Sequence, residues 1–431
     1  MLKSAYVEEV FTLRAGDRVE LLGWVRNVRQ HGKLVFLDLR DSTGVVQVTV
    51  KTGVADEEAV KTASTLGREA SVKVVGRVVE DRRAPGGREI LCERLEVVGR
   101  AYGEYPIKPG VGPRFLYDNR HLYLRSPKVS AIMKIRSAMV EAARRWFIEH
   151  GFTEIHCPTF ITAAVEGGAT LFEVNYFGRK AYLTQSVQFY QEAAIYGLEK
   201  VFSIQPSFRA EKSKTRRHLT EFWHIEAEMA FTELPELLET VEQLISYMVV
   251  ETVEKRKREF TELGRRFNVE VVEPPFERIK YEEALNILES KGVTISWGED
   301  LGADEERILT EQFDKPFFVT HYPKEAKAFY HMPDPSNPRV TLSADLLAPK
   351  GYGEIVGGGQ RIHDYKLLIQ RIEEENLNPQ DYRWYLDLRK YGTIPHSGFG
   401  LGVERLLQWI LNLRNIRSAC LFPRTRQRIY P

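Results

Sequence analysis

Hydrophobic and polar positions alternate in short runs along the first hundred residues, the pattern of β-strands that bury one face. Turn-forming residues separate the runs, at Gly32, at residues 41–44 and at residues 84–87. Between the third run and the fourth, Glu57 to Leu66 has the spacing of a short helix. The pattern predicts strands at Val19–Val28, Leu34–Arg40, Val45–Lys51, Ala70–Val79 and Ile90–Val98. We therefore expect a β-rich domain at residues 1–100.

Five strands with a helix in this place are the order of an OB-fold barrel, which binds single-stranded nucleic acid on its strand face. Basic side chains fall on or near that face, among them Arg26, Arg29 and Arg40. Phe36 offers a ring on which a base can stack, although the same alternation also allows Phe36 to belong to the barrel core. The net charge of the chain is only +1, so contacts with nucleic acid must come from local basic patches.

Proline and glycine are concentrated at residues 101–115, which we interpret as a linker before a second domain at residues 116–431. Hydrophobic residues make up 43% of the chain and charged residues 28%, as in soluble globular proteins. The three cysteines are far apart, which argues against disulfides or a zinc site and favours a reducing cytoplasm. No apolar run reaches the length of a membrane span, and the N-terminus lacks the pattern of a signal peptide.

The most informative stretch of the second domain is Gln205 to Phe231, which reads as a strand, a basic loop and a returning strand. The first strand is expected over Val201–Glu211. In the returning strand one face is apolar and can pack on a core, while the other can contact a ligand. The ligand-facing row is Phe222, His224, Glu226 and Glu228, and the loop carries Lys212, Lys214, Arg216, Arg217 and His218. Cations, carboxylates and a ring suit a ligand with a polyphosphate, a metal ion and a flat base. A solvated hairpin would explain the charged loop alone.

Two further segments have the pattern of regular structure around this hairpin. Ser130–His150 is an amphipathic helix, followed by a strand at Phe152–His156 that ends at Pro158. Residues 395–405 form a glycine-rich strand that leads into a helix, where a flat ligand can lie against the backbone.

The intervening residues 232–313 are expected to form helices and loops without chemistry, beginning with one long helix or two over Leu234–Phe260. Their acidic residues are expected on the surface. Strands are predicted at Phe317–Tyr322 and Ala328–Met332 before the chain returns to the site.

The hairpin sequence RAEKSKTRRHLTEF, followed by HIEAEMAF, resembles motif 2 of the class II aminoacyl-tRNA synthetases. Within that family it is most similar to the asparaginyl branch of the aspartyl, asparaginyl and lysyl subgroup, with motif 2 at about residues 201–231. Residues 130–158 resemble motif 1, which forms the homodimer interface in the family, and residues 395–413 resemble motif 3. The resemblance implies an α+β protein, in which a five-stranded OB-fold β-barrel precedes an antiparallel β-sheet catalytic domain flanked by helices.

The resemblance also implies a site for ATP and Mg²⁺. The residues that it places around ATP are Arg209, Glu211, Arg217, His218, Phe222, Glu354, Gly402 and Arg405. Adenine would stack between Phe222 and Arg405. Glu354 would be the principal ligand of the metal, with Asp345 as a second candidate, because carboxylates beside glycines leave room for a hydrated ion. Three residues after Glu354 stands Gly357, where certain aspartyl enzymes have a serine.

For the amino acid, the resemblance implies Glu166, Gln188, Gln191, Glu226 and Arg361. Gln191 takes the position at which similar aspartyl enzymes have a lysine that neutralises the substrate carboxylate. A buried carboxylate without a cation is costly, whereas a neutral carboxamide is not, so Gln191 favours asparagine over aspartate. Glu226 replaces an aspartate of the aspartyl enzymes. It can accept a hydrogen bond from a substrate amide and would repel a carboxylate.

The implied reaction is the activation of L-asparagine by ATP and its transfer to tRNA(Asn), by a cytoplasmic homodimer without membrane contact. In the barrel, the resemblance assigns Arg26, Phe36 and Gln47 to the anticodon, with Phe36 stacked on its middle base. Three alternatives stay open: an aspartyl enzyme that is discriminating or not, an asparagine synthetase on the same catalytic core, and a non-catalytic RNA-binding relative. The amino-acid residues argue against the first, the barrel against the second, and the ATP arginines against the third.

Overall fold

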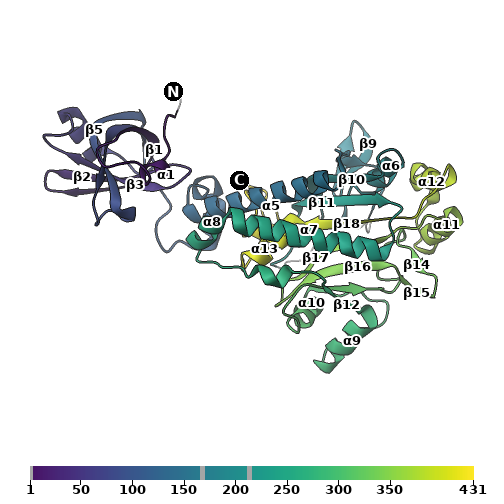
Figure 1. Cartoon of the computed structure of the whole chain (residues 1–431). Helices are drawn as coiled ribbons and strands as arrows, with labels where there is room; N and C mark the ends of the chain where they lie inside the picture. The colour runs from purple at the N-terminus through teal and green to yellow at the C-terminus, as the bar shows by residue number, and fades with distance from the viewer. Residues whose placement is uncertain (1–2, 166–169, 211–215) are drawn as a thin grey trace. The chain divides into compact units, whose positions relative to one another are not determined.

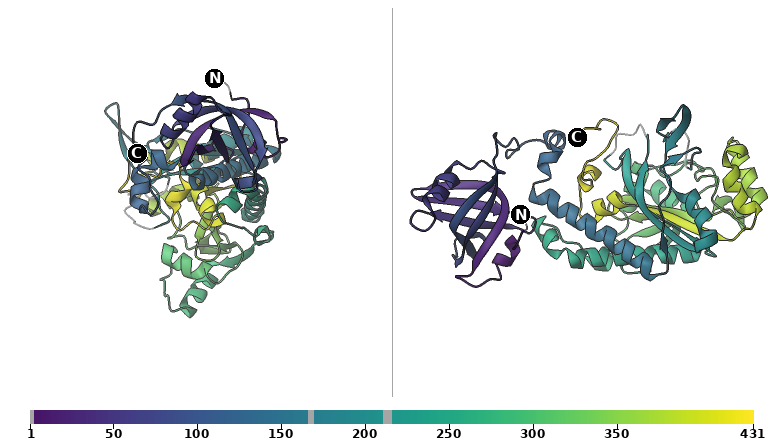
Figure 2. Two further views of the ribbon diagram at one scale, coloured as in Figure 1. Left: turned by 90° about the vertical axis from the view of Figure 1, so that its left-hand side faces the viewer. Right: turned by 90° about the horizontal axis from the view of Figure 1, so that it is seen from above.

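The computed structural model describes residues 3–165, 170–210 and 216–431. Within them the chain forms two compact units, Met1–Leu116 and Tyr117–Pro431. Figure 1 shows the elements of both units, and Figure 2 shows them from two further sides. Each unit has an apolar core of its own.

The described residues of the first unit form a closed barrel with the strand order β1-β2-β3-β5-β4. The strands are β1 (Arg18–His31), β2 (Leu34–Arg40), β3 (Val45–Lys51), β4 (Ser71–Glu80) and β5 (Arg88–Gly99), after a short helix α1 (Val7–Val10). Helix α2 (Glu57–Thr65) lies between β3 and β4, and the Asp56 side chain caps its first turn. The predicted strands, helix and barrel are confirmed. β1 extends to His31 rather than Val28, because its last residues pair with the start of β2.

Alternate side chains of the barrel strands point inward, as expected of strands that bury one face. In β2, Val35, Leu37 and Leu39 are buried, while Phe36 and Asp38 are half-buried on the outer side. The alternative that placed Phe36 in the barrel core is therefore wrong.

Eight strands of the described second unit form one sheet, in the order β12-β13-β16-β17-β18-β11-β10-β6. Neighbouring strands run antiparallel except at the two edges of the sheet. There β12 runs parallel to β13, and β6 runs parallel to β10. The strands are β12 (Glu277–Lys280), β13 (Phe317–Thr320), β16 (Ser343–Ala348), β17 (Gly353–Gln360), β18 (His396–Gly402), β11 (Glu221–Ala230), β10 (Lys200–Phe208) and β6 (Thr153–Glu154). The hairpin predicted from the alternation is β10 and β11, although β10 is shorter than the expected strand.

Helices α5 (Pro127–Glu149) and α7 (Leu234–Lys255) lie side by side along one face of this sheet (Figure 1). Ser126 caps α5, Pro127 stands in its first turn, and Gly151 with φ +78° follows its end. The apolar row of β11 packs against these helices in the main core of the unit. Burying one large apolar side chain contributes about 1.5–3 kcal/mol, so this contact fixes which face of β11 is turned away from the core. The predicted helix over Leu234–Phe260 is two helices, since α8 (Lys257–Glu262) follows α7.

Between β13 and β16 the chain passes the end of β17. Ala328–Met332 is a turn rather than the predicted strand, because the His331 N–H donates to the carbonyl of Ala328 (3.1 Å). Only one isolated bridge, between His331 and Arg361, joins the described turn to the end of β17. The other helices and strands described are α3 (Pro113–Asp118), α4 (Arg120–Tyr123), α6 (Gln188–Leu198), α9 (Tyr281–Ser290), α10 (Ala303–Thr310), α11 (Tyr365–Glu374), α12 (Arg383–Lys390), α13 (Val403–Ile410), β7 (Phe160–Ile161), β8 (Glu173–Tyr176), β9 (Arg179–Leu183), β14 (Pro333–Asp334) and β15 (Asn337–Thr341). Among the described helices, none combines the length and the apolar character needed to cross a bilayer.

Candidate active site

A cavity of about 950 Å³ opens over the face of β11 that is turned away from α5 and α7. Glycines of β17 and β18, among them Gly357, Gly358 and Gly400, line its floor. The cavity gathers many of the residues expected at a site for ATP, metal and amino acid. Those that line it are Gln188, Gln191, Arg209, Glu226, Asp345, Glu354 and Arg361.

An adjoining pocket contains the remaining described residues that the sequence assigned to the nucleotide. It is lined by Arg209, Arg217, His218, Phe222, Glu354, Gly402 and Arg405. The guanidinium of Arg209 lies 5.9 Å from the centroid of the Phe222 ring. Burial lowers the pKa of His224 to about 3, helped by Arg209 and Arg405, so this ring is neutral near pH 7 and leaves the positive charge to the arginines. Cations around an aromatic ring suit a nucleoside phosphate.

Two carboxylates converge beside Gly357. A Cβ at this residue would lie 3.1 Å from Glu354 Oε1 and 3.3 Å from Asp345 Oδ1, so the absence of a side chain leaves space between the two oxygens. Arg405 Nη1 lies 2.7 Å from Glu354 Oε2, and Lys327 Nζ lies 2.7 Å from Asp345 Oδ2.

The two carboxyl groups differ in their charge state. Burial raises the pKa of Glu354, but Arg405 and Lys327 outweigh it and lower that pKa to about 2. Burial, together with the neighbouring Glu354, raises the pKa of Asp345 to about 7 against the opposing effect of Lys327. A pair of oxygen ligands whose like charges oppose each other is a fitting place for a divalent cation.

The amino-acid end of the cavity holds two of the predicted residues, Gln191 and Glu226, in fixed orientations. The side-chain amide of Gln191 donates to Ser203 Oγ (3.1 Å) and to the carbonyl oxygen of Glu226 (2.9 Å). The buried carboxylate of Glu226 accepts from the hydroxyl of Ser186 and from the N–H of Val187 (3.1 Å). This end of the cavity therefore contains the neutral carboxamide of Gln191 and the acid of Glu226, the two side chains from which the sequence predicted a preference for asparagine over aspartate.

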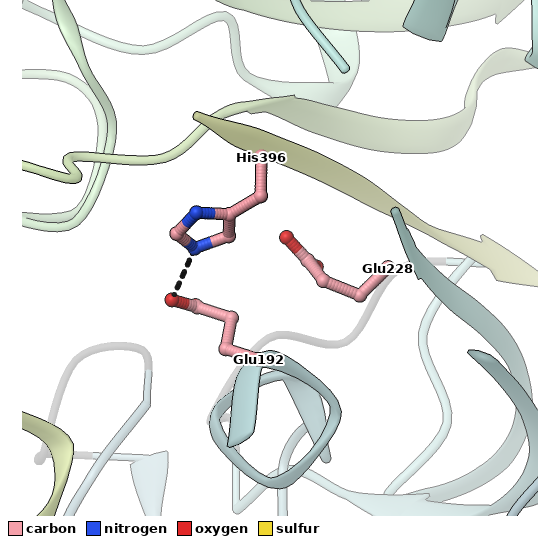
Figure 3. Close-up of side chains that lie close together, drawn as sticks. All are labelled: Glu192, Glu228 and His396. Atoms are coloured by element: carbon pink, nitrogen blue, oxygen red, sulfur yellow. Dashed lines mark hydrogen bonds and ion pairs between the residues drawn. The ribbon is translucent and has the colours of Figure 1, made fainter. Parts of the chain in front are cut away.

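Behind these residues lies a buried network that sequence reasoning did not find (Figure 3). Glu192 of α6, Glu228 of β11 and His396 of β18 point toward one another. Glu228 accepts from Arg361 Nε (3.1 Å) and Arg361 Nη2 (3.2 Å). Glu192 forms an ion pair with Arg389 and lies 3.0 Å from His396 Nε2. Each of the two acids therefore has a buried arginine as its partner, as a buried charge requires.

The network connects directly to the amino-acid end. Gln188 Nε2 donates to Glu192 Oε1 (2.9 Å), which leaves the oxygen of the Gln188 amide to face other groups. The paired Arg361 likewise has its guanidinium plane set by Glu228. Thus Glu192 and Glu228 orient two residues that line the cavity. Glu228 stands on the predicted ligand-facing row, but 204 residues separate Glu192 from His396, so no local pattern indicated the network.

The expectation that the acidic residues of 232–313 lie on the surface is wrong for Glu242 and Glu259, which are buried, and for Glu306, whose side chain is largely buried. Asp300 and Glu306 line the cavity, and Glu306 Oε2 lies 2.6 Å from Arg217 Nη2. The N-terminal part of α10 brings Glu306 to the start of β17, where it also accepts from the Glu354 N–H (2.8 Å). Lys327 was likewise not found from the sequence, since a lysine in a loop has no distinguishing pattern.

Two predicted site residues, Glu166 and Glu211, lie outside the described residues. In the barrel, Arg26 is exposed on β1, while Phe36 and Gln47 lie on neighbouring strands β2 and β3. Gln47 Oε1 accepts from Arg29 Nη2 (3.0 Å), and Gln47 Nε2 donates to Glu89 Oε2 (2.7 Å). The amide of Gln47 is therefore held in one orientation beside a half-buried ring, as a site that reads a base requires.

Known proteins resemble both units. Residues 113–426 match the family of class II tRNA synthetases (D, K and N), and residues 19–98 match the OB-fold nucleic acid binding domain. The asparagine–tRNA ligase of Pyrococcus furiosus is 55% identical over the full length of both chains.

Solved structures resemble the whole chain. A crystal structure of asparaginyl-tRNA synthetase from Pyrococcus horikoshii, complexed with asparaginyl-adenylate, has a TM-score of 0.96 at 54% identity and covers 100% of both chains. An aspartyl-tRNA synthetase from Entamoeba histolytica is more distant, with a TM-score of 0.87 at 28% identity over 100% of this chain and 93% of its own. With its OB-fold barrel, its α+β catalytic unit and these relatives, the chain belongs to the class II aminoacyl-tRNA synthetases of the aspartyl, lysyl and asparaginyl group.

Proposed function

We propose that this protein is an asparagine–tRNA ligase, which activates L-asparagine with ATP and transfers it to the 3′ end of tRNA(Asn). The observation that carries the proposal is the amino-acid end of the cavity. Gln191 supplies no positive charge for a substrate carboxylate there, and the buried acid Glu226 opposes one, so an amide side chain is favoured. The full-length relative from Pyrococcus furiosus supports the same substrate.

In the proposed complex ATP lies in the adjoining pocket, with adenine between Phe222 and Arg405. Arg209 holds the α-phosphate, and Arg217 and His218 take the γ-phosphate, while Gly402 lets the nucleotide approach the backbone. Glu211 is assigned to the adenine amino group from the family resemblance. The lining of the pocket by these cations supports the arrangement.

Activation needs no nucleophilic side chain of the enzyme. An oxygen of the asparagine carboxylate attacks the α-phosphorus, and the bond from that phosphorus to the bridging oxygen breaks, so that pyrophosphate leaves with the electron pair. The enzyme contributes by holding the two substrates in line and by stabilising the developing negative charge through Arg209 and its neighbours. In the second step a hydroxyl of the terminal ribose attacks the carbonyl carbon, and AMP leaves.

Glu354 and Asp345 would hold Mg²⁺, since their carboxylate oxygens converge over Gly357. When bound, the ion supplies positive charge to the phosphates. Lys327 and Arg405 pair with the same carboxylates and keep them in place.

The amino acid is positioned from both ends. Gln188 and Glu166 bind its α-ammonium group, and Gln191, Glu226 and Arg361 bind its side chain. Glu166 is assigned from the family resemblance. The roles of the other four residues are supported by the shared cavity and by the network that orients Gln188 and Arg361.

For the whole chain we propose an anticodon-binding domain at residues 1–100, a linker at 101–115 and a catalytic domain at 116–431. Arg26, Phe36 and Gln47 contact the anticodon. Two copies form a homodimer through motif 1, and the protein works in the cytoplasm. Sedimentation at twice the mass of the chain is expected, and a monomer at working concentration would contradict the dimer.

Amino-acid-dependent exchange between ATP and pyrophosphate tests the substrate. We expect exchange with asparagine to exceed exchange with aspartate or lysine by orders of magnitude in kcat/KM. Preference for aspartate would overturn the substrate while leaving the family intact. Addition of EDTA should stop the exchange, and excess Mg²⁺ should restore it.

A further inference from the structure

The turn at the end of β17 places one more side chain in the cavity, the imidazole of His331. Only 6% of this residue is exposed, and it lines the cavity. A Cβ at Gly359 would lie 2.7 Å from His331 Nδ1, so the ring lies directly over that glycine. Gly357, Gly359 and Arg361 share one face of the strand path, because side chains two apart point to the same side. The face is that of Glu354 and Asp345, since a Cβ at Gly357 points at both.

The ring of His331 has no hydrogen bond to any described residue, and its Nδ1 is a buried atom without a partner. Buried polar groups are nearly always paired, and an unpaired one is costly to the fold. Nδ1 is enclosed over Gly359, so a molecule in the cavity can pair with the ring through its other nitrogen, Nε2, which also has no hydrogen bond to the described residues. The alternative is a structural role, in which the ring only fills the space above Gly359.

The charges around the ring keep it neutral. Burial lowers the pKa of His331 well below its ordinary value, and Arg361, Lys327 and Arg371 lower it further against the opposing effect of Glu192. A neutral imidazole offers one N–H donor and one acceptor nitrogen. It matches a carboxamide, which has both kinds of group, and mismatches a carboxylate, which can only accept.

We propose that His331 binds the side-chain carboxamide of the amino-acid substrate next to Arg361, and that it helps to select asparagine over aspartate. The inference rests on the proposed function and names an additional residue of its site. The donor groups of Arg361 face the carboxamide oxygen, and the acceptor nitrogen of His331 faces the carboxamide NH₂. With aspartate, that nitrogen would face an oxygen, and the neighbouring cations oppose the protonation that would relieve the mismatch.

The test compares asparagine and aspartate in ATP–pyrophosphate exchange for wild type, His331→Phe and His331→Gln. Phenylalanine keeps an aromatic ring near Tyr330, whose centroid lies 4.8 Å from that of His331, but it removes both nitrogens. We expect kcat/KM for asparagine to fall about tenfold, mainly through KM, with little change for aspartate. Glutamine retains a neutral donor and acceptor and should recover most of the loss. His331→Leu replaces the phenylalanine variant if the latter does not fold.

His321→Asn is the matched control. This histidine lies near the same turn, bonds to Thr320 Oγ1 (2.9 Å) and does not line the cavity, and asparagine tolerates its φ of +58°. It should keep the wild-type discrimination. Thermal unfolding without ligands should show His331→Phe at least as stable as wild type, since an unpaired polar group is removed.

Equal losses for both amino acids would overturn the inference, because they would place His331 at the shared α-groups. Unchanged kinetics would overturn it as well, as would a loss of stability without a change in discrimination. Absence of asparagine-dependent exchange in the wild type would instead refute the proposed function itself.

Discussion

Replacing Glu192 by glutamine tests whether the buried network behind the cavity determines the stability of the catalytic unit. Glu192 is fully buried and forms an ion pair with Arg389. It accepts from the hydroxyl of Tyr385 at 2.8 and 2.7 Å, and from Gln188 Nε2 at 2.9 Å. Glutamine preserves the shape but removes the charge, so Arg389 is left buried without its counter-ion.

Removing one partner of a buried ion pair costs about 3–5 kcal/mol. Glutamine can keep one hydrogen bond, so we expect the lower end, about 3 kcal/mol. Arg389 Nη1 already has no partner among the described residues, so the network has little capacity to compensate. A large domain loses roughly 2 °C in its thermal unfolding midpoint per kcal/mol, so the midpoint of Glu192→Gln should lie roughly 6 °C below that of the wild type.

The loss should depend on pH in a defined direction. Burial raises the pKa of Glu192, but Arg389, His396 and Arg361 outweigh burial and hold it below the ordinary value. The stabilisation is therefore complete above the ordinary glutamate pKa of about 4.3, and it disappears as pH falls through the lower native pKa. The difference in the free energy of unfolding between wild type and Glu192→Gln should be constant from about pH 8 to 5 and become smaller below about pH 4.

Urea unfolding followed by circular dichroism and by tryptophan fluorescence measures the free energy of unfolding. Glu149→Gln, an exposed substitution on α5, is the control and should change it by less than about 0.5 kcal/mol. The KM for asparagine should also rise in Glu192→Gln, because Gln188 loses its anchor. A variant as stable as the control would refute the reasoning, and so would a gap that widens toward low pH.

Three further predictions concern the site and the barrel. Gln191→Lys combined with Glu226→Asp should move the ratio of kcat/KM toward aspartate by about tenfold or more, and an unchanged ratio in pyrophosphate exchange would contradict the roles of both residues. Arg209→Ala should raise the activation barrier of asparagine-dependent exchange by about 3 kcal/mol, which lowers its rate roughly 150-fold. A wild-type rate would contradict the contact between Arg209 and the α-phosphate. Phe36→Ala should weaken tRNA binding by about 1–3 kcal/mol without changing exchange, whereas Phe177→Ala, at an exposed ring of the other unit, should leave tRNA affinity unaltered.

The sequence predicted the elements whose signals are local. The barrel strands and the two strands of the hairpin follow from alternation, and α5 follows from its apolar spacing and its ends, because each depends on residues a few positions apart. The register of the hairpin also follows, since shifting it by one residue would turn Ile225 and Met229 toward solvent and Glu226 into the core. Motifs of this local kind, compared with the family, also led to the nucleotide and amino-acid residues.

The sequence did not predict features that depend on contacts between residues far apart in the chain. The strand predicted at Ala328–Met332 is a turn, since only the long-range contact with the end of β17 determines its path. Glu306 was expected in solvent, but α10 carries it to Arg217, 89 residues earlier in the chain.

The sequence by itself therefore determined the two-part organisation, the faces of the strands and the residue types available to bind a nucleotide and an amide. Tertiary structure alone decided how those residues are paired: Lys327 with Asp345, Arg361 with Glu228, and Arg389 with Glu192. The reason is physical. A buried charge must find a partner wherever the fold brings one, and the identity of that partner depends on the packing of distant segments.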